Sequence, residues 1–207
     1  MSVTVISRIV LVLLVIFGSR PALAGTVLIV GDSLSAGYGL PNGSGWVSLL
    51  NKRLVAEYPN VSLVNASISG ETTAGGKRRI QALLERHQPG IVVVELGAND
   101  GLRGIHIPLI RDNLTAIVDA CLASGAKALV LGMRVPPNYG REYAEKFHAM
   151  FKEVSSRKGV ALVPFLLDGF ADDRAMFQED GIHPASDAQP MMVDTVYEQL
   201  RPLLRDW

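Results

Sequence analysis

The sequence predicts a single α/β domain in which a parallel five-stranded sheet lies between two layers of helices. Short runs rich in Val, Ile and Leu alternate with amphipathic segments, and the apolar runs do not alternate apolar with polar residues. Strands that are buried on both faces have this continuous pattern, and helices on both sides of a parallel sheet bury them. The length of 207 residues suits one domain.

Five segments have the composition of buried strands, and each is followed by a segment with helical spacing. The expected strands are Thr26–Val30, Val61–Asn65, Ile91–Leu96, Ala128–Val135 and Ala161–Leu166. The expected helices show the i, i+3, i+4 stripe that buries one face, and their apolar markers lie within 46–54, 80–84, 110–121, 143–154 and 192–203. Right-handed crossovers then favour a flavodoxin-like strand order, 2-1-3-4-5.

Residues 1–24 are expected to be a signal peptide, separate from the domain at 25–207. Arg8 precedes the apolar run Ile9–Phe17, and a small-x-small site ends at Ala24. This order is that of a secretory signal. A membrane anchor is the alternative, but the apolar run is shorter than the ~20 residues that span a bilayer. We therefore expect cleavage after Ala24 and a periplasmic or secreted protein.

Charge and cysteine content argue against several functional classes. The formal net charge is zero and no basic run occurs, so nothing indicates nucleic-acid binding. The sequence has no Cys/His cluster with ligand spacing, so we expect no metal and no cofactor. The single cysteine, Cys121, shares an apolar stripe with Ile110, Leu114 and Ile117, which predicts a buried, inert thiol. We expect a monomer.

Polar residues follow the predicted strands, at the edge where open α/β sheets bind ligands. A serine nucleophile needs a base within hydrogen-bond reach, and a histidine base needs a carboxylate to orient it. The sequence offers these residue types at that edge. They are Ser33 after the first strand, Ser69 and Gly70 after the second, Asn99 and Asp100 after the third, and Asp180 and His183 after the fifth.

Among the four histidines we favour His183 as the base, with His106 as the alternative. Asp180 and His183 could instead be turn and capping residues before the last helix. Ser186 and Gln189 already fit a capping box there, which leaves the aspartate and histidine free for other roles. The G-x-S-x-G elbow of α/β-hydrolases is absent from the sequence.

Four ordered blocks, "GDSLSAGYG", "NASISG", "GAND" and "DGIHP", resemble those of the GDSL, or SGNH, hydrolases. The resemblance covers the whole of residues 25–207 and implies the SGNH hydrolase fold. It implies that Ser33 is the nucleophile, that His183 is the base and then the acid, and that Asp180 orients His183.

The resemblance also implies an oxyanion hole built from three donors. These are the backbone N–H groups of Ser33 and Gly70 and the side-chain amide of Asn99. A glycine leaves the approach to its N–H open, and an amide is a donor that does not titrate. The other polar residues of the blocks are expected to hold the loops, and they are Asp32, Ser35 and Asp100.

Apolar residues near the expected site are candidates to line an acyl groove, although loop packing explains them equally well. They are Leu102, Ile105, Ile107, Pro136, Pro137 and Tyr139. The resemblance implies that "DGLRG" is a lid over a fatty acyl chain and that the substrate is an acyl ester, a thioester or a lysophospholipid. One alternative is a carbohydrate O-acetylesterase or acetyltransferase of the same superfamily. Another is a non-catalytic flavodoxin-like binding protein, although no phosphate-cradling motif occurs.

Overall fold

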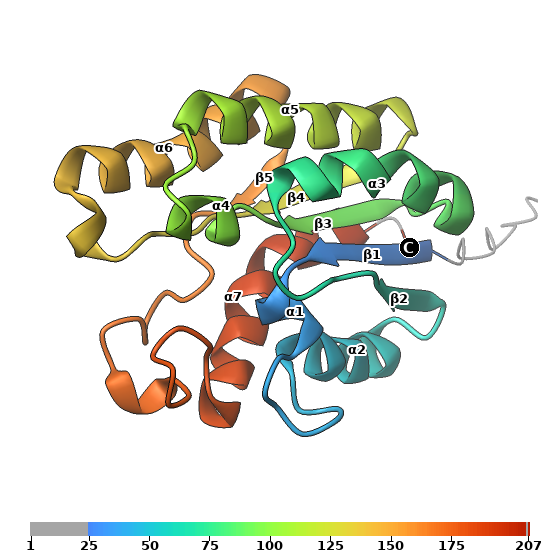
Figure 1. The fold of residues 1–207 in the computed structure, drawn as a ribbon. Coiled ribbons are helices and arrows are strands. Elements are labelled where there is room, and N and C mark those ends of the chain that lie inside the picture. The colour runs from blue at the N-terminus through green and yellow to red at the C-terminus, as the bar shows by residue number, and fades with distance from the viewer. Residues whose placement is uncertain (1–24, 206) are drawn as a thin grey trace, which may run out of the picture.

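The computed structural model, which describes residues 25–205 and 207, confirms the fold class and the strand order. One parallel sheet has the order β2-β1-β3-β4-β5. Helices α3, α5 and α6 cover one face of the sheet, and α2 and α7 cover the other (Figure 1). The strands are β1 (Gly25–Gly31), β2 (Val61–Asn65), β3 (Ile91–Glu95), β4 (Lys127–Leu131) and β5 (Ala161–Val163).

The helices fill the intervals between the strands as their apolar stripes predict. Two short helices, α1 (Ser33–Ala36) and α4 (Ala98–Leu102), begin just after β1 and β3. The longer helices are α2 (Trp46–Glu57), α3 (Thr73–His87), α5 (Ile107–Ala123), α6 (Arg141–Lys158) and α7 (Gln189–Leu200). Four single turns of 3₁₀ helix complete the described part, at Pro137–Tyr139, Arg174–Met176, Ser186–Ala188 and Arg201–Leu204.

Burial along the strands follows their place in the sheet. All five residues of the central strand β3 are buried, whereas the edge strand β2 buries only its first residue fully. A central strand is covered by helices on both faces, which is why its sequence is continuously apolar. Glu95 breaks this pattern, because it is a fully buried acid at the carboxyl end of β3.

Two strands end three or more residues earlier than expected, and β3 ends one residue early, at Glu95. β4 stops at Leu131 and β5 at Val163, although the apolar runs continue to Val135 and Leu166. Pro164 lacks the N–H that would extend the ladder, and the chain is instead held by bonds from Gly132 N–H to Val163 O at 2.8 Å and from Leu166 N–H to Gly132 O at 2.9 Å. The apolar residues beyond these ends therefore belong to loops at the carboxyl edge of the sheet.

The expected capping box before α7 is wrong. Neither Ser186–Ala188 nor α7 has a side-chain cap. The Gln189 side chain instead accepts from the Trp46 N–H at 2.9 Å and donates to Pro184 O at 3.1 Å. It thereby ties the start of α2 to the loop that carries His183.

The expected signal peptide lies outside the described residues, so its cleavage stays a prediction. Within residues 25–205 and 207, no helix has both the length and the hydropathy needed to cross a membrane.

Candidate active site

Ser33 sits at the tip of the turn that leaves β1. Asp32 caps α1 by accepting from the Leu34 N–H at 3.0 Å, and Gly37 ends this one-turn helix in the left-handed conformation, at φ 76°. Ser33 is half-buried and lines a cavity, whereas Ser35 is 3% exposed and donates to Glu95 Oε2 at 2.7 Å. The structure therefore separates the two serines of "GDSLS": the first faces open space, and the second faces the core.

His183 and Asp180 meet Ser33 across the edge of the sheet. His183 Nε2 lies 2.9 Å from Ser33 Oγ, and His183 Nδ1 lies 2.6 Å from Asp180 Oδ2. The other Asp180 oxygen accepts from the backbone N–H groups of Ile182 at 2.9 Å and His183 at 3.0 Å. Partial burial acts to raise the pKa of Asp180, but these N–H groups and the His183 imidazole outweigh it and lower the pKa to about 2. Asp180 is therefore a carboxylate that fixes the imidazole.

Hydrogen bonds to backbone carbonyl groups stabilise the loop that carries His183. The Arg174 guanidinium donates to the carbonyls of Phe177, Gln178 and Glu179 at 3.1, 2.7 and 2.7 Å. The Gln178 N–H donates to His183 O at 2.8 Å, and its side-chain amide donates to Tyr38 O at 2.9 Å. Tyr38 in turn places its ring 4.6 Å from the His183 ring. Gln178 thus joins the loop that carries His183 to the loop that follows Ser33.

The three expected oxyanion donors come from the three segments that follow β1, β2 and β3. Within the described part of the chain, the N–H groups of Ser33 and Gly70 donate to no other protein group. Gly70 has φ 78°, which favours glycine, and nothing lies within 4 Å of the position that a Cβ would take. Asn99, in the first turn of α4, donates one amide hydrogen to Asp32 Oδ2 at 3.0 Å, and its second amide hydrogen is available for a ligand.

Asp32 and Asp100 hold loops, as expected. Asp100 accepts from the Thr73 N–H at 2.9 Å and the Thr73 hydroxyl at 2.7 Å, which fixes the start of α3. Asp32 is 1% exposed, and burial raises its pKa to about 6 against the opposing effect of the Leu34 N–H.

Sequence reasoning missed Glu95, which accepts hydrogen bonds from Asp32 and Ser35 in the turn that carries Ser33. The available signal was a single acid inside an apolar run, since a buried acid needs a partner.

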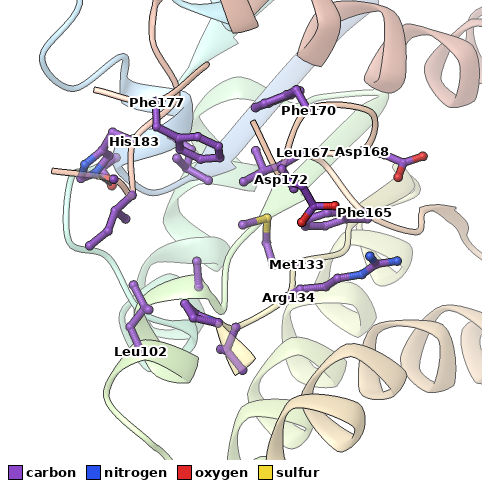
Figure 2. A pocket seen from close by; sticks show the side chains of 18 of the residues that line it. Leu102, Met133, Arg134, Phe165, Leu167, Asp168, Phe170, Asp172, Phe177 and His183 are labelled. Atoms are coloured by element: carbon purple, nitrogen blue, oxygen red, sulfur yellow. Dashed lines mark hydrogen bonds between the residues drawn. The ribbon is translucent and has the colours of Figure 1, made fainter. Parts of the chain in front are cut away.

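A cavity of about 1090 Å³ opens beside Ser33 and His183. Figure 2 shows His183 on one side of this cavity and Arg134 and Asp168 on the other, with Met133 between them. The lining of the cavity is mostly apolar and includes Leu102, Met133, Val135, Pro136, Leu167 and Phe177.

The chain is similar to known proteins over most of its length. Residues 29–189 match the GDSL-like Lipase/Acylhydrolase family. The chain belongs to this family. Esterase TesA of Pseudomonas aeruginosa is 48% identical over 186 residues, which are 90% of this chain and 92% of that protein. Thioesterase 1/protease 1/lysophospholipase L1 of Escherichia coli is 43% identical over 191 residues, 92% of this chain and 90% of that protein. A crystal structure of TesA matches with a TM-score of 0.84, over 86% of this chain and 99% of that chain.

The GDSL-like hydrolase does not gather all the expected groove residues at its cavity. Leu102, Pro136 and Pro137 line the cavity beside Ser33. Ile107 and Tyr139 line a second cavity, with His106, and Ile105 packs against the hydrophobic core. The Tyr139 hydroxyl donates to Leu102 O at 2.7 Å, so it supports the segment that was expected to line the groove.

The "DGLRG" segment of the hydrolase is not simply a loop. Asp100, Gly101 and Leu102 form the end of α4, and Gly104 follows with φ 64°. A Cβ at Gly101 would lie 2.6 Å from Val135 Cγ1 and 2.7 Å from Phe147 Cε2, so α4 packs closely on its neighbours. The first three residues of this segment therefore belong to a short, tightly packed helix.

Two other expectations concern groups outside the catalytic constellation. Cys121 is fully buried, which confirms the expected burial, and burial raises the pKa of its thiol to about 12. Among residues 25–205 and 207, no three His, Cys, Asp or Glu side chains lie together as a metal site would require.

Proposed function

We propose that this hydrolase cleaves acyl esters and thioesters through a covalent acyl-enzyme on Ser33. The observation that carries the proposal is the 2.9 Å contact between Ser33 Oγ and His183 Nε2. This contact supports the proposal because a serine hydroxyl is a weak nucleophile and needs a base within hydrogen-bond reach. Two relatives support the same reaction class. One is named an esterase, and the other is named a thioesterase and lysophospholipase.

In the first step, Ser33 Oγ attacks the substrate carbonyl carbon while His183 Nε2 takes the hydroxyl proton. The Asp180 carboxylate holds the Nδ1–H and stabilises the imidazolium that forms. Negative charge develops on the carbonyl oxygen, and the Ser33 N–H, the Gly70 N–H and the Asn99 amide are the donors proposed to stabilise it. Donors fixed before the reaction cost no reorganisation when that charge appears.

Collapse of the tetrahedral intermediate breaks the bond to the leaving oxygen or sulfur, and His183 gives its proton to that atom. A water molecule then attacks the acyl-enzyme, with His183 again as the base. Ser33 recovers its proton when the acid product leaves. The steps together use the substrate, one water molecule and backbone and side-chain groups of this chain.

We further propose that the acyl group is a fatty acyl chain and that a lysophospholipid is among the substrates. Apolar side chains such as Leu102, Met133 and Val135 line the cavity next to Ser33. Burial of a methylene group contributes about 0.8 kcal/mol, so a longer chain gains affinity for as long as the groove continues. An O-acetyl sugar would leave this apolar lining unused, which disfavours the carbohydrate alternative.

The test combines covalent labelling with rate measurements. A reactive phosphonate ester should label the wild type on the peptide that contains Ser33, as identified by mass spectrometry. Ser33→Ala should lose both labelling and hydrolysis, whereas Ser35→Ala should keep the label on Ser33. Initial rates on aryl esters of increasing chain length, and on an acetylated sugar, then define the acyl preference. Equal hydrolysis by wild type and Ser33→Ala would overturn the proposed nucleophile.

We also propose that the protein is exported as a monomer after cleavage following Ala24. Arg8, the apolar run 9–17 and the small residues before position 25 support the export signal. N-terminal sequencing and gel filtration of protein recovered from a periplasmic fraction test both statements. An intact N-terminus in that fraction would contradict cleavage at this site.

A further inference from the structure

Glu95 is a buried acid that takes no part in the chemistry proposed above. It ends β3, lies in register with Gly31 of β1, and has 0% exposed surface. Its Oε2 accepts from the Ser35 hydroxyl at 2.7 Å and from the Asp32 N–H at 3.2 Å. Its Oε1 has no hydrogen-bond partner within the described part of the chain. A carboxylate with one unpartnered buried oxygen is far more costly than a neutral carboxylic acid in the same place.

One oxygen atom, Glu95 Oε2, thus binds the turn that carries Ser33 at two points. Asp32 precedes Ser33 and Ser35 follows it by two residues, and both donate to the same Glu95 Oε2. Gly31 makes this approach possible, because a Cβ there would lie 2.6 Å from Ser35 Oγ and 2.8 Å from Glu95 Oε2. Glu95 therefore fixes the position of the nucleophile relative to β3.

The same contacts continue to the proposed oxyanion donor. Asp32 Oδ1 accepts from the Leu34 N–H, and Asp32 Oδ2 accepts from the Asn99 amide, both at 3.0 Å. Both carboxyl oxygens of Asp32 thus accept hydrogen bonds, whereas only one oxygen of Glu95 does. Hydrogen bonds to a carboxylate favour its ionised form, so Asp32 ionises more readily than Glu95. His183 is the titratable group that faces Asp32 from the loop before α7. Burial, and next the negative charge of Asp32, raise the pKa of Glu95 well above its usual range.

We propose that Glu95 is a permanently neutral carboxylic acid and a positioning residue, which fixes the Ser33 turn directly and the Asn99 amide through Asp32. The inference rests on the proposed function, because it assigns a role in that same site. Of these two adjacent acids, Glu95 is protonated and Asp32 is ionised. The turn therefore carries a single negative charge, and this charge orients Asn99.

Two substitutions separate a neutral acid from other roles. Glu95→Gln keeps a carbonyl oxygen for Ser35 and Asp32 and is neutral, so we expect kcat within about threefold of the wild type. Glu95→Leu has similar size but no acceptor, and it leaves the Ser35 hydroxyl and the Asp32 N–H unpaired. We expect it to lower kcat by about 10²-fold with little change in KM, because the nucleophile and the oxyanion donor lose their alignment. Glu142→Gln, on the exposed first turn of α6, is the matched control for removal of a glutamate.

Infrared spectroscopy tests the protonation state directly. The wild type at pH 8 should show the C=O stretching band of a protonated carboxyl, although ordinary carboxyl groups are ionised there. This band should be absent from Glu95→Gln and present in Glu142→Gln. Its absence from the wild type would overturn the neutral acid, and a loss of kcat in Glu95→Gln as large as in Glu95→Leu would overturn the positioning role.

The phosphonate label keeps this inference distinguishable from the proposed function. If the wild type is not labelled on Ser33, the proposed function fails. If it is labelled and Glu95→Leu has wild-type kcat, only the inference fails. If Glu95→Leu does not fold, the kcat and the infrared band of Glu95→Gln decide the question alone.

Discussion

Replacing Asp180 with asparagine should disable the base while leaving its loop folded. Asp180 Oδ1 accepts from the N–H groups of Ile182 and His183, and an asparagine carbonyl can keep both bonds. The amide NH₂ would then face His183 Nδ1, which lies 2.6 Å from Oδ2 in the wild type. Because two donors cannot pair, the imidazole must carry its proton on Nε2. In that tautomer Nε2 cannot accept the proton of Ser33.

The size of the effect follows from the exposure of Asp180. The equivalent exchange at the buried aspartate of a serine protease lowers kcat by about 10⁴-fold. The Asp180 side chain is 37% exposed, so water screens its charge and can also bind the new amide. We therefore expect a smaller loss, about 10³-fold in kcat, which corresponds to about 4 kcal/mol of transition-state stabilisation. KM should change by less than about threefold, because ground-state binding does not use the tautomer.

The assay is steady-state hydrolysis of a soluble aryl ester, with thermal unfolding measured on the same samples. The Tm of Asp180→Asn should lie within about 4 °C of the wild type, which is about 1 kcal/mol for a chain of this size. Asp180→Ala removes all three bonds and should lower Tm further, with a similar loss of kcat. A folded Asp180→Asn that keeps more than a tenth of wild-type kcat would refute the tautomer argument.

Three further predictions test other contacts of the site. Asn99→Ala should lower kcat by about 10²–10³-fold with little change in KM, and an unchanged kcat would remove Asn99 from the oxyanion hole. Gln178→Leu loses the bonds to Tyr38 O and Pro184 O and should lower kcat by about tenfold, a size that alignment effects readily reach; a wild-type rate in folded protein would contradict its joining role. The native pKa of Asp180, about 2, lies below its ordinary value, so its ionised form stabilises the fold at neutral pH and this contribution falls as pH drops from about 4 towards 2. The difference in unfolding free energy between wild type and Asp180→Asn should shrink over that window in denaturant titrations, and a constant difference would exclude the linkage.

The sheet and the meeting of the candidate site residues at its edge could be predicted from the sequence because each has a local signature. Continuous apolar runs mark strands covered on both faces, and Ser33, Asn99 and His183 each follow such a run. The strand ends were less predictable, because Val135 and Leu166 look like strand residues, although Val135 lines the cavity and Leu166 is buried in the core beyond the end of β5. Hydrophobicity does not distinguish burial in a sheet from burial beneath a loop.

The supporting contacts could not be predicted, because they join residues far apart in the chain. Nothing near Gln178 in the sequence indicates a bond to Tyr38, 140 residues away. Tyr139 was a candidate to line the acyl groove, with loop packing as the equal alternative, and its hydroxyl donates to Leu102 O. A loop side chain can point into the cavity or pack against other protein groups. The path of the loop backbone decides between the two, and amino-acid composition does not specify that path.

The contact between Ser33 and His183 joins residues 150 positions apart, and it exists only when β1 and the loop after β5 belong to one folded domain. During synthesis the serine emerges early, and the histidine emerges shortly before the final helix. A nascent chain is therefore chemically inert towards the esters around it until translation is almost complete. Loss of hydrolysis in denaturant should for the same reason coincide with global unfolding, which makes activity a reporter of the intact fold.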